Sequence, residues 1–123
     1  METNKKITIV IGASPNPKRY SYMAVIKLIE AGYIVYPIGI KDGNINGISI
    51  IKNKLEVNNV HTITMYLSPK HQPEYYDYIV KLNPKRLIFN PGTYNQELKT
   101  IAEGNGIEII YDCTLVMINM GLY

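Results

Sequence analysis

Short apolar stretches alternate with amphipathic stretches along the whole chain. Residues 7–11 are rich in β-branched side chains and end at Gly12, which predicts a strand buried on both faces. A proline-containing loop follows, and Ser21 is placed to cap a helix over residues 22–31. The chain therefore opens with a predicted strand-loop-helix unit.

The same alternation continues to the last residues. Further strands are expected at residues 33–38, 62–67, 86–89 and 107–111, with helices at 71–82 and 95–103. The remaining segments are ambiguous: residues 48–51 read as a short edge strand, 52–58 as a helical turn, and 113–118 as a short final strand or tail.

Strands that alternate with helices of about ten residues predict parallel β-α-β units with right-handed crossovers. We therefore expect an α/β fold that is Rossmann-like and doubly wound. Its mainly parallel sheet would have about five or six strands with helices on both faces. Residues 1–123 would form one domain. In such folds ligands bind outside the carboxyl ends of the strands, so the loops that follow the strands matter most.

The loop after the first strand favours an anion. Gly12 permits a tight turn, and Ala13 and Ser14 are small enough for their backbone amides to approach a phosphate. Lys18 and Arg19 supply positive charge just before the predicted helix. The second and third glycines of the dinucleotide fingerprint are missing, so the same residues also fit an ordinary strand-to-helix connection with surface cations.

The loop after the second strand argues against NAD. A dinucleotide site has Asp or Glu there for the ribose hydroxyls, whereas this chain has Lys41 before its first acid, Asp42. Lys41 fits a ligand with a phosphate on its ribose, such as NADP or coenzyme A, and equally fits an exposed loop lysine. The third and fourth loops offer main-chain groups and hydroxyls, or simply terminate their strands: Leu67, Ser68 and Pro69, then Asn90, Pro91, Gly92 and Thr93.

Charge and cysteine content narrow the class of protein. The net charge is +3, but the longest basic runs are pairs and form no stripe, so we expect no nucleic-acid partner. The apolar run at residues 7–11 is too short for a signal peptide or a membrane span. Cys113, the single cysteine, excludes an internal disulfide. A cytoplasmic protein without membrane contacts is expected.

No complete catalytic set is visible. Ser14 has no evident base, and no metal-ligand cluster or carboxylate pair stands out. His71 lies beside the third loop and could contact a ligand, whereas Cys113 follows Asp112 in an apolar stretch typical of an inert core cysteine.

Residues 10–21, Val-Ile-Gly-Ala-Ser-Pro-Asn-Pro-Lys-Arg-Tyr-Ser, resemble the opening of the small bacterial CoA-binding domain proteins. These proteins are similar to the nucleotide-binding domain of the succinyl-CoA synthetase α subunit. The likeness continues through residues 32–38, 67–69, 90–93 and 106–108, although Gly39-Ile40 replaces the Asn-Pro that family members usually carry.

The resemblance implies a Rossmann-like fold that binds coenzyme A or an acyl-CoA across the strand ends. It puts the pyrophosphate near Gly12, Ala13 and Ser14, with Lys18, Arg19, Tyr20 and Ser21 nearby. Pro37, Ile38 and Lys41 would face the adenosine end, and Leu67, Ser68, Pro69, Asn90, Pro91, Gly92 and Thr93 would border the other side.

Three classes of function follow from these observations. The first is a CoA-binding module without chemistry of its own. The second is an enzyme that uses NADP or an acyl-CoA, with His71 or Cys113 as the notable groups. The third is an interaction subunit with a vestigial pocket. Its tyrosine-rich helix, with Tyr75, Tyr76 and Tyr78, cannot be buried on all sides, so one side of it would face a partner protein or a second copy.

Overall fold

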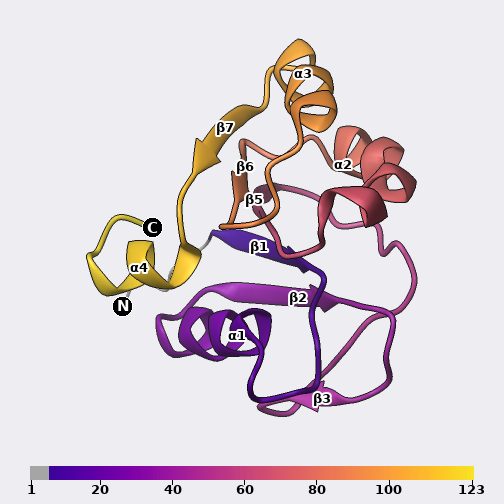
Figure 1. Cartoon of the computed structure of the whole chain (residues 1–123). Coiled ribbons are helices and arrows are strands. Elements are labelled where there is room, and N and C mark those ends of the chain that lie inside the picture. Colours follow the sequence, from indigo (N-terminus) through magenta and orange to yellow (C-terminus); the bar gives the residue numbers. More distant parts are fainter. Residues whose placement is uncertain (1–5) are drawn as a thin grey trace.

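One parallel sheet forms the centre of the molecule. The computed structural model describes residues 6–123. The strands of the main sheet are β1 (Ile7–Ile11), β2 (Ile34–Ile38), β5 (Val60–Met65), β6 (Arg86–Phe89) and β7 (Glu108–Tyr111). Their order is β2-β1-β5-β6-β7, and every neighbouring pair is parallel (Figure 1). From β1 the chain moves outward to β2 and then returns to the opposite side of β1, so strand order reverses between β1 and β5.

Helices cover both faces of this sheet (Figure 1). They are α1 (Tyr20–Glu30), α2 (Tyr76–Leu82), α3 (Gln96–Gly104) and α4 (Thr114–Asn119). Helices α1 and α4 contact each other and pack on one face, whereas α2 and α3 pack together on the other. The predicted Rossmann-like, doubly wound α/β fold is therefore confirmed. No helix within residues 6–123 is long and apolar enough to cross a membrane.

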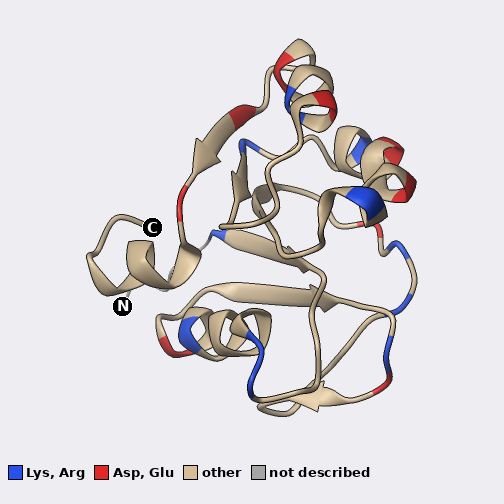
Figure 2. Ribbon diagram, in the orientation of Figure 1, with Lys and Arg blue, Asp and Glu red and all other residues tan. Residues whose placement is uncertain are grey.

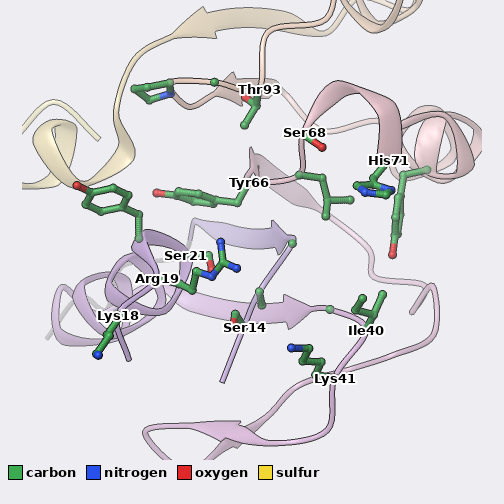
Figure 3. A pocket seen from close by; sticks show the side chains of 18 residues that line it. Ser14, Lys18, Arg19, Ser21, Ile40, Lys41, Tyr66, Ser68, His71 and Thr93 are labelled. Atoms are coloured by element: carbon green, nitrogen blue, oxygen red, sulfur yellow. The ribbon is translucent and has the colours of Figure 1, made fainter. Parts of the chain in front are cut away.

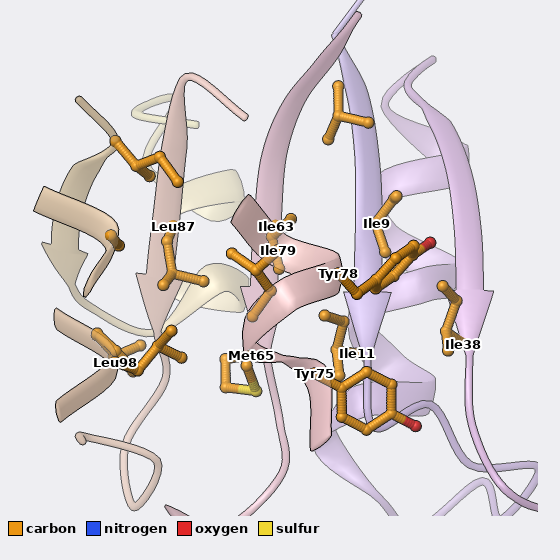
Figure 4. Close-up of a cluster of buried hydrophobic side chains, with 14 residues drawn as sticks. Ile9, Ile11, Ile38, Ile63, Met65, Tyr75, Tyr78, Ile79, Leu87 and Leu98 are labelled. Carbon is orange, nitrogen blue, oxygen red and sulfur yellow. The ribbon is translucent and has the colours of Figure 1, made fainter. Parts of the chain in front are cut away.

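Strand β1 contributes to both cores, as its β-branched run predicts. Ile9 and Ile11 lie in the cluster under α2 and α3, and Val10 lies in the cluster under α1 (Figure 4). All three side chains are fully buried, and each contributes about 2 kcal/mol through burial of its apolar surface. Strand β1 is thus fixed in position, and with it the loop that starts at Gly12.

Four local predictions are wrong. Residues 113–118 contain helix α4 instead of a strand or tail, because Thr114 and Met117 pack inward toward the sheet. Residues 52–58 contain no helical turn. The edge strand expected at residues 48–51 is present in part: β4 (Ile48–Ser49) forms a small hairpin with β3 (Asn44–Ile45), closed by residues 46–47 with positive φ, and Ile51 bridges Ile38 of β2.

The helix expected at residues 71–82 is split. Two 3-10 turns, η1 (Pro69–His71) and η2 (Pro73–Tyr75), precede α2. The prolines begin both turns and lack the amide that a continuous helix would use. Ser21 is not a cap: it lies inside α1 and is buried, while Arg19 occupies the N-cap position.

Candidate functional site

A cavity of about 650 Å³ opens at the carboxyl ends of the strands, beside the point where strand order reverses. Its walls come from the four loops that follow β1, β2, β5 and β6. This is where a doubly wound sheet places its ligands, and the volume lies within the range of small-molecule sites. All the first-loop residues predicted for the site line the cavity: Gly12, Ala13, Ser14, Lys18, Arg19, Tyr20 and Ser21.

The first loop turns sharply against its neighbours at Gly12. The φ angle of Gly12 is +97°, and a Cβ there would lie 2.9 Å from the carbonyl carbon of Tyr66, so only glycine fits. The amides of Gly12 and Ala13 both donate to the carbonyl of Ile38 at 2.9 Å. Of the two amides predicted to approach a phosphate, that of Ala13 therefore holds the loop to β2, whereas for the amide of Ser14 the contact stays a prediction.

The stretch between Ser14 and α1 is organised around Asn16. Its Oδ1 accepts from the amide of Lys18 at 3.0 Å, and its carbonyl accepts from the amide of Arg19 at 3.0 Å. The hydroxyl of Ser14 in turn accepts from the amide of Asn16 at 3.1 Å. These bonds aim the first turn of α1 at the cavity, where Arg19 provides no side-chain cap. An uncapped helix N-terminus favours an anion through its free amides and its dipole.

Positive charge dominates the lining of the cavity. Arg19 and Lys41 extend on the side of their loops that faces Ser14, whereas Lys18 extends away from it (Figure 3). The stretch that leads into α1 is basic on the ribbon (Figure 2). No Asp or Glu of residues 6–123 lines the cavity, and Asp42 pairs instead with Lys52 at 3.0 Å. The site therefore attracts anions.

The second loop touches the first at Gly39. A Cβ on Gly39 would lie 2.2 Å from the carbonyl oxygen of Ala13, a distance that no side chain permits. Next to it, Ile40 is 79% exposed and lines the cavity together with Lys41. Pro37 and Ile38 do not line it, since both are buried within β2. Of the residues predicted in this loop, Lys41 lines the cavity and Pro37 and Ile38 do not.

The third and fourth loops form the opposite wall. The predicted residues that line the cavity there are Leu67, Ser68, Pro91, Gly92 and Thr93. Pro69 and Asn90 do not. Asn90 is buried and ties neighbouring segments together: its Nδ2 donates to Thr64 Oγ1 at 2.7 Å, and its Oδ1 accepts from the amide of Thr114 at 2.8 Å. Its role is to hold β5, β6 and α4 in place.

Several lining residues were not named as candidates: Gly39, Ile40, Tyr66 and Tyr75. His71, expected beside the third loop, also lines the cavity. Tyr66 follows directly after β5, and burial raises the pKa of its hydroxyl well above the usual value. That phenol therefore stays protonated. The sequence analysis missed Tyr66 because the predicted strand at residues 62–67 includes it, whereas β5 ends at Met65 and leaves Tyr66 at the start of the loop.

The other chemically notable residues are not assembled into a catalytic set. His71 is exposed at the cavity wall, and Cys113 is half-buried outside the lining. Within residues 6–123, no three of His, Cys, Asp and Glu gather where they could hold a metal ion. In the tyrosine-rich segment, Tyr75 and Tyr78 are buried in the core and Tyr76 is half-buried.

A Rossmann-like domain with a cationic cavity at its strand ends defines the nucleotide-binding class of α/β proteins. Within that class the chain belongs to the CoA binding domain family, whose model matches residues 6–119. Comparison with curated proteins finds no match.

Solved structures share the fold. One, described as an uncharacterized protein, is 42% identical with a TM-score of 0.94, over 98% of this chain and 100% of that one. A hypothetical protein from Pyrococcus horikoshii OT3 is 29% identical with a TM-score of 0.81, covering 95% of this chain and 82% of its own. The dinucleotide forming acetyl-coenzyme A synthetase 1 of Ca. Korarchaeum cryptofilum is 18% identical with a TM-score of 0.69, covering 85% of this chain and 25% of its own, and shows the fold alone.

Proposed function

We propose that this chain binds coenzyme A or an acyl-CoA in the cavity at the strand ends and performs no chemistry of its own. The observation that carries the proposal is the cavity itself. It is lined by Arg19 and Lys41 without a carboxylate, in a chain of the CoA binding domain family. Coenzyme A carries a pyrophosphate and a ribose phosphate, so it needs cations at two separate places.

The pyrophosphate is assigned to the first turn of α1. There the uncapped amides of the helix and the guanidinium of Arg19 meet the cavity beside Ser14. Charge-assisted hydrogen bonds of this kind are about twice as strong as neutral ones. The amides of Gly12 and Ala13 take no part, since they bond to β2.

The ribose phosphate and the adenine are assigned to the second loop. Lys41 provides the charge, and the exposed side chain of Ile40 provides an apolar surface for the base. The pantetheine arm then runs toward the wall formed by Leu67, Tyr75 and Thr93. NADP shares the ribose phosphate but carries a nicotinamide riboside in place of this arm, so it would make different contacts with the far wall of the cavity.

Calorimetric titration of the purified protein with CoA, acetyl-CoA, NADP and NAD tests the proposal. CoA and acetyl-CoA should bind with similar affinity, NADP more weakly, and NAD least, since it lacks the ribose phosphate. NADP binding more tightly than CoA would support the alternative of an NADP-dependent enzyme. Absence of CoA binding would remove the proposed function.

A further inference from the structure

Gln72 is a buried polar residue between two walls of the cavity. It lies between η1 and η2, and its side chain is fully buried. Its Nε2 donates two hydrogen bonds, to the carbonyl of Leu67 at 2.9 Å and to the carbonyl of Thr93 at 2.7 Å. Both donors of the amide are therefore used, each on a different loop.

The two carbonyls belong to residues that line the cavity. Leu67 follows β5 and Thr93 follows β6, so the amide of Gln72 joins the loops of two neighbouring strands. A fully buried amide that lost these partners would cost about 1 to 3 kcal/mol for each unpaired group. The spacing of the two loops is thus tied to one side chain.

The remaining polar atom of the Gln72 amide, its oxygen, links the two loops to helix α3. Gln72 Oε1 accepts from Asn95 Nδ2 at 3.0 Å. Asn95 also caps α3, because its Oδ1 accepts from the amides of Glu97 at 3.0 Å and Leu98 at 3.3 Å. The cavity wall is therefore connected, through Gln72 and Asn95, to the N-terminus of α3.

The residues just before Gln72 have little burial to hold them, whereas Tyr75 after it is buried in the core. Ser68, Pro69, Lys70 and His71 are all exposed, and the 3-10 turn they form is short. Such a segment opens at low free-energy cost unless it is tied down. Gln72 provides that tie next to Ser68 and His71, which both line the cavity.

We propose that Gln72 is a positioning residue: by bonding Leu67 and Thr93 at once, it holds the two walls at the spacing that grips the ligand. The inference rests on the proposed function for the identity of the ligand. A glutamine is required because its amide supplies two donors and one acceptor from one planar group. Glutamate has the same shape but no donor for either carbonyl when ionised.

The test compares Gln72→Glu with a variant that loses a buried hydrogen bond elsewhere. Tyr78→Phe serves as the matched control, since the Tyr78 hydroxyl donates to the carbonyl of Leu55 and does not line the cavity. Both variants should lose stability. Calorimetry with CoA, under conditions where each variant is folded, should show at least about tenfold weaker binding for Gln72→Glu. Tyr78→Phe should bind as the unaltered protein does. Equal affinity of Gln72→Glu and the unaltered protein would overturn the proposal.

Hydrogen exchange without ligand gives an independent readout. The amides of His71 and Thr93 bond to the carbonyls of Ser68 and Asn90 at 3.0 Å, within the two loops. In Gln72→Glu they should exchange faster, with the α1 amides unchanged. Unchanged exchange at His71 and Thr93 would overturn the positioning role even if the unaltered protein bound no CoA. If the unaltered protein bound no CoA and exchange in Gln72→Glu were faster, the proposed ligand would be wrong and the role of Gln72 in holding the two loops would be supported.

Discussion

The two ends of the parallel sheet both carry cations, but the surroundings of these cations differ. At the amino end, Arg86 is 8% exposed, its Nε donates to Thr62 Oγ1 at 2.7 Å, and its guanidinium lies 4.5 Å from the ring centroid of Tyr123. The hydroxyls of Tyr123 and Thr8 are 2.6 Å apart. Protein side chains thus fill the space around this cation.

At the carboxyl end, Arg19 and Lys41 border a cavity of about 650 Å³. The backbone at this end turns at Gly12. Gly39 lets the second loop lie against the first without a side chain that would fill the cavity. The contrast shows that a cation alone does not define a site. A ligand needs charge together with a backbone that leaves room for it.

The largest effect is expected from Gly39→Ala, which disrupts the loops at the carboxyl end of the sheet. Gly39→Ala would put a Cβ 2.2 Å from the carbonyl oxygen of Ala13, so the first two loops must move apart. We expect a loss of about 3 kcal/mol in the free energy of unfolding. CoA binding should be lost as well. Urea unfolding and calorimetry measure the two losses.

Gly104→Ala is the control for that substitution. Gly104 lies in α3, where an added Cβ would have no neighbouring atom within 4 Å, and alanine favours the helix more than glycine does. The control should raise the free energy of unfolding by about 0.5 kcal/mol. A Gly39→Ala protein as stable as Gly104→Ala would show that the two loops are not in contact.

Removing single cations tests the difference between the two ends with a smaller expected effect. Arg19→Met and Lys41→Met should each weaken CoA binding by about tenfold, because each loses charge-assisted bonds to a phosphate. Stability should hardly change, since both side chains are exposed. Lys85→Met removes an exposed cation next to β6 at the amino end and is the matched control. If Lys85→Met weakened CoA binding as much as Arg19→Met, binding would depend on net charge and not on the cavity.

The smallest expected effect is a pH dependence at the amino end. Burial lowers the pKa of His61 from 6.5, and the nearby charges of Arg86, Lys6 and Lys85 lower it further, against an opposing effect of Glu108. The unfolded chain therefore takes up this proton more readily than the folded protein. The contribution of His61 to stability is present above about pH 6.5 and is lost as the pH falls through the lowered folded pKa.

His61→Gln should flatten this part of the pH dependence. Urea unfolding between about pH 8 and pH 5 measures it, with CoA affinity at neutral pH as the companion readout. Affinity should not change, because His61 does not line the cavity. An unaltered slope in His61→Gln would mean that another group titrates in this range.

The order and type of most elements could be predicted because each has a strong local pattern. The β-branched run of β1 and the strand-helix alternation required parallel pairing, and that pairing put the four loops at one edge. The same reasoning predicted most of the cavity lining, although the ligand contacts of those residues stay predictions.

The failures came from tertiary contacts that local patterns do not encode. Helix α4 was interpreted as a strand because its six residues show an apolar run without a clear period. The amides of Gly12 and Ala13 found a partner in Ile38, a residue distant in sequence. Gln72 has no motif at all, and only the fold shows that its amide joins two loops.

The most direct test of the central claim is a titration of the ¹⁵N-labelled protein with CoA, followed by amide chemical shifts. The largest changes should occur at Ser14, in the first turn of α1 and at Ile40 and Lys41, with none at His61 or Lys85. Changes confined to the amino end of the sheet, or none at all, would contradict the claim that the open, cationic end holds the nucleotide.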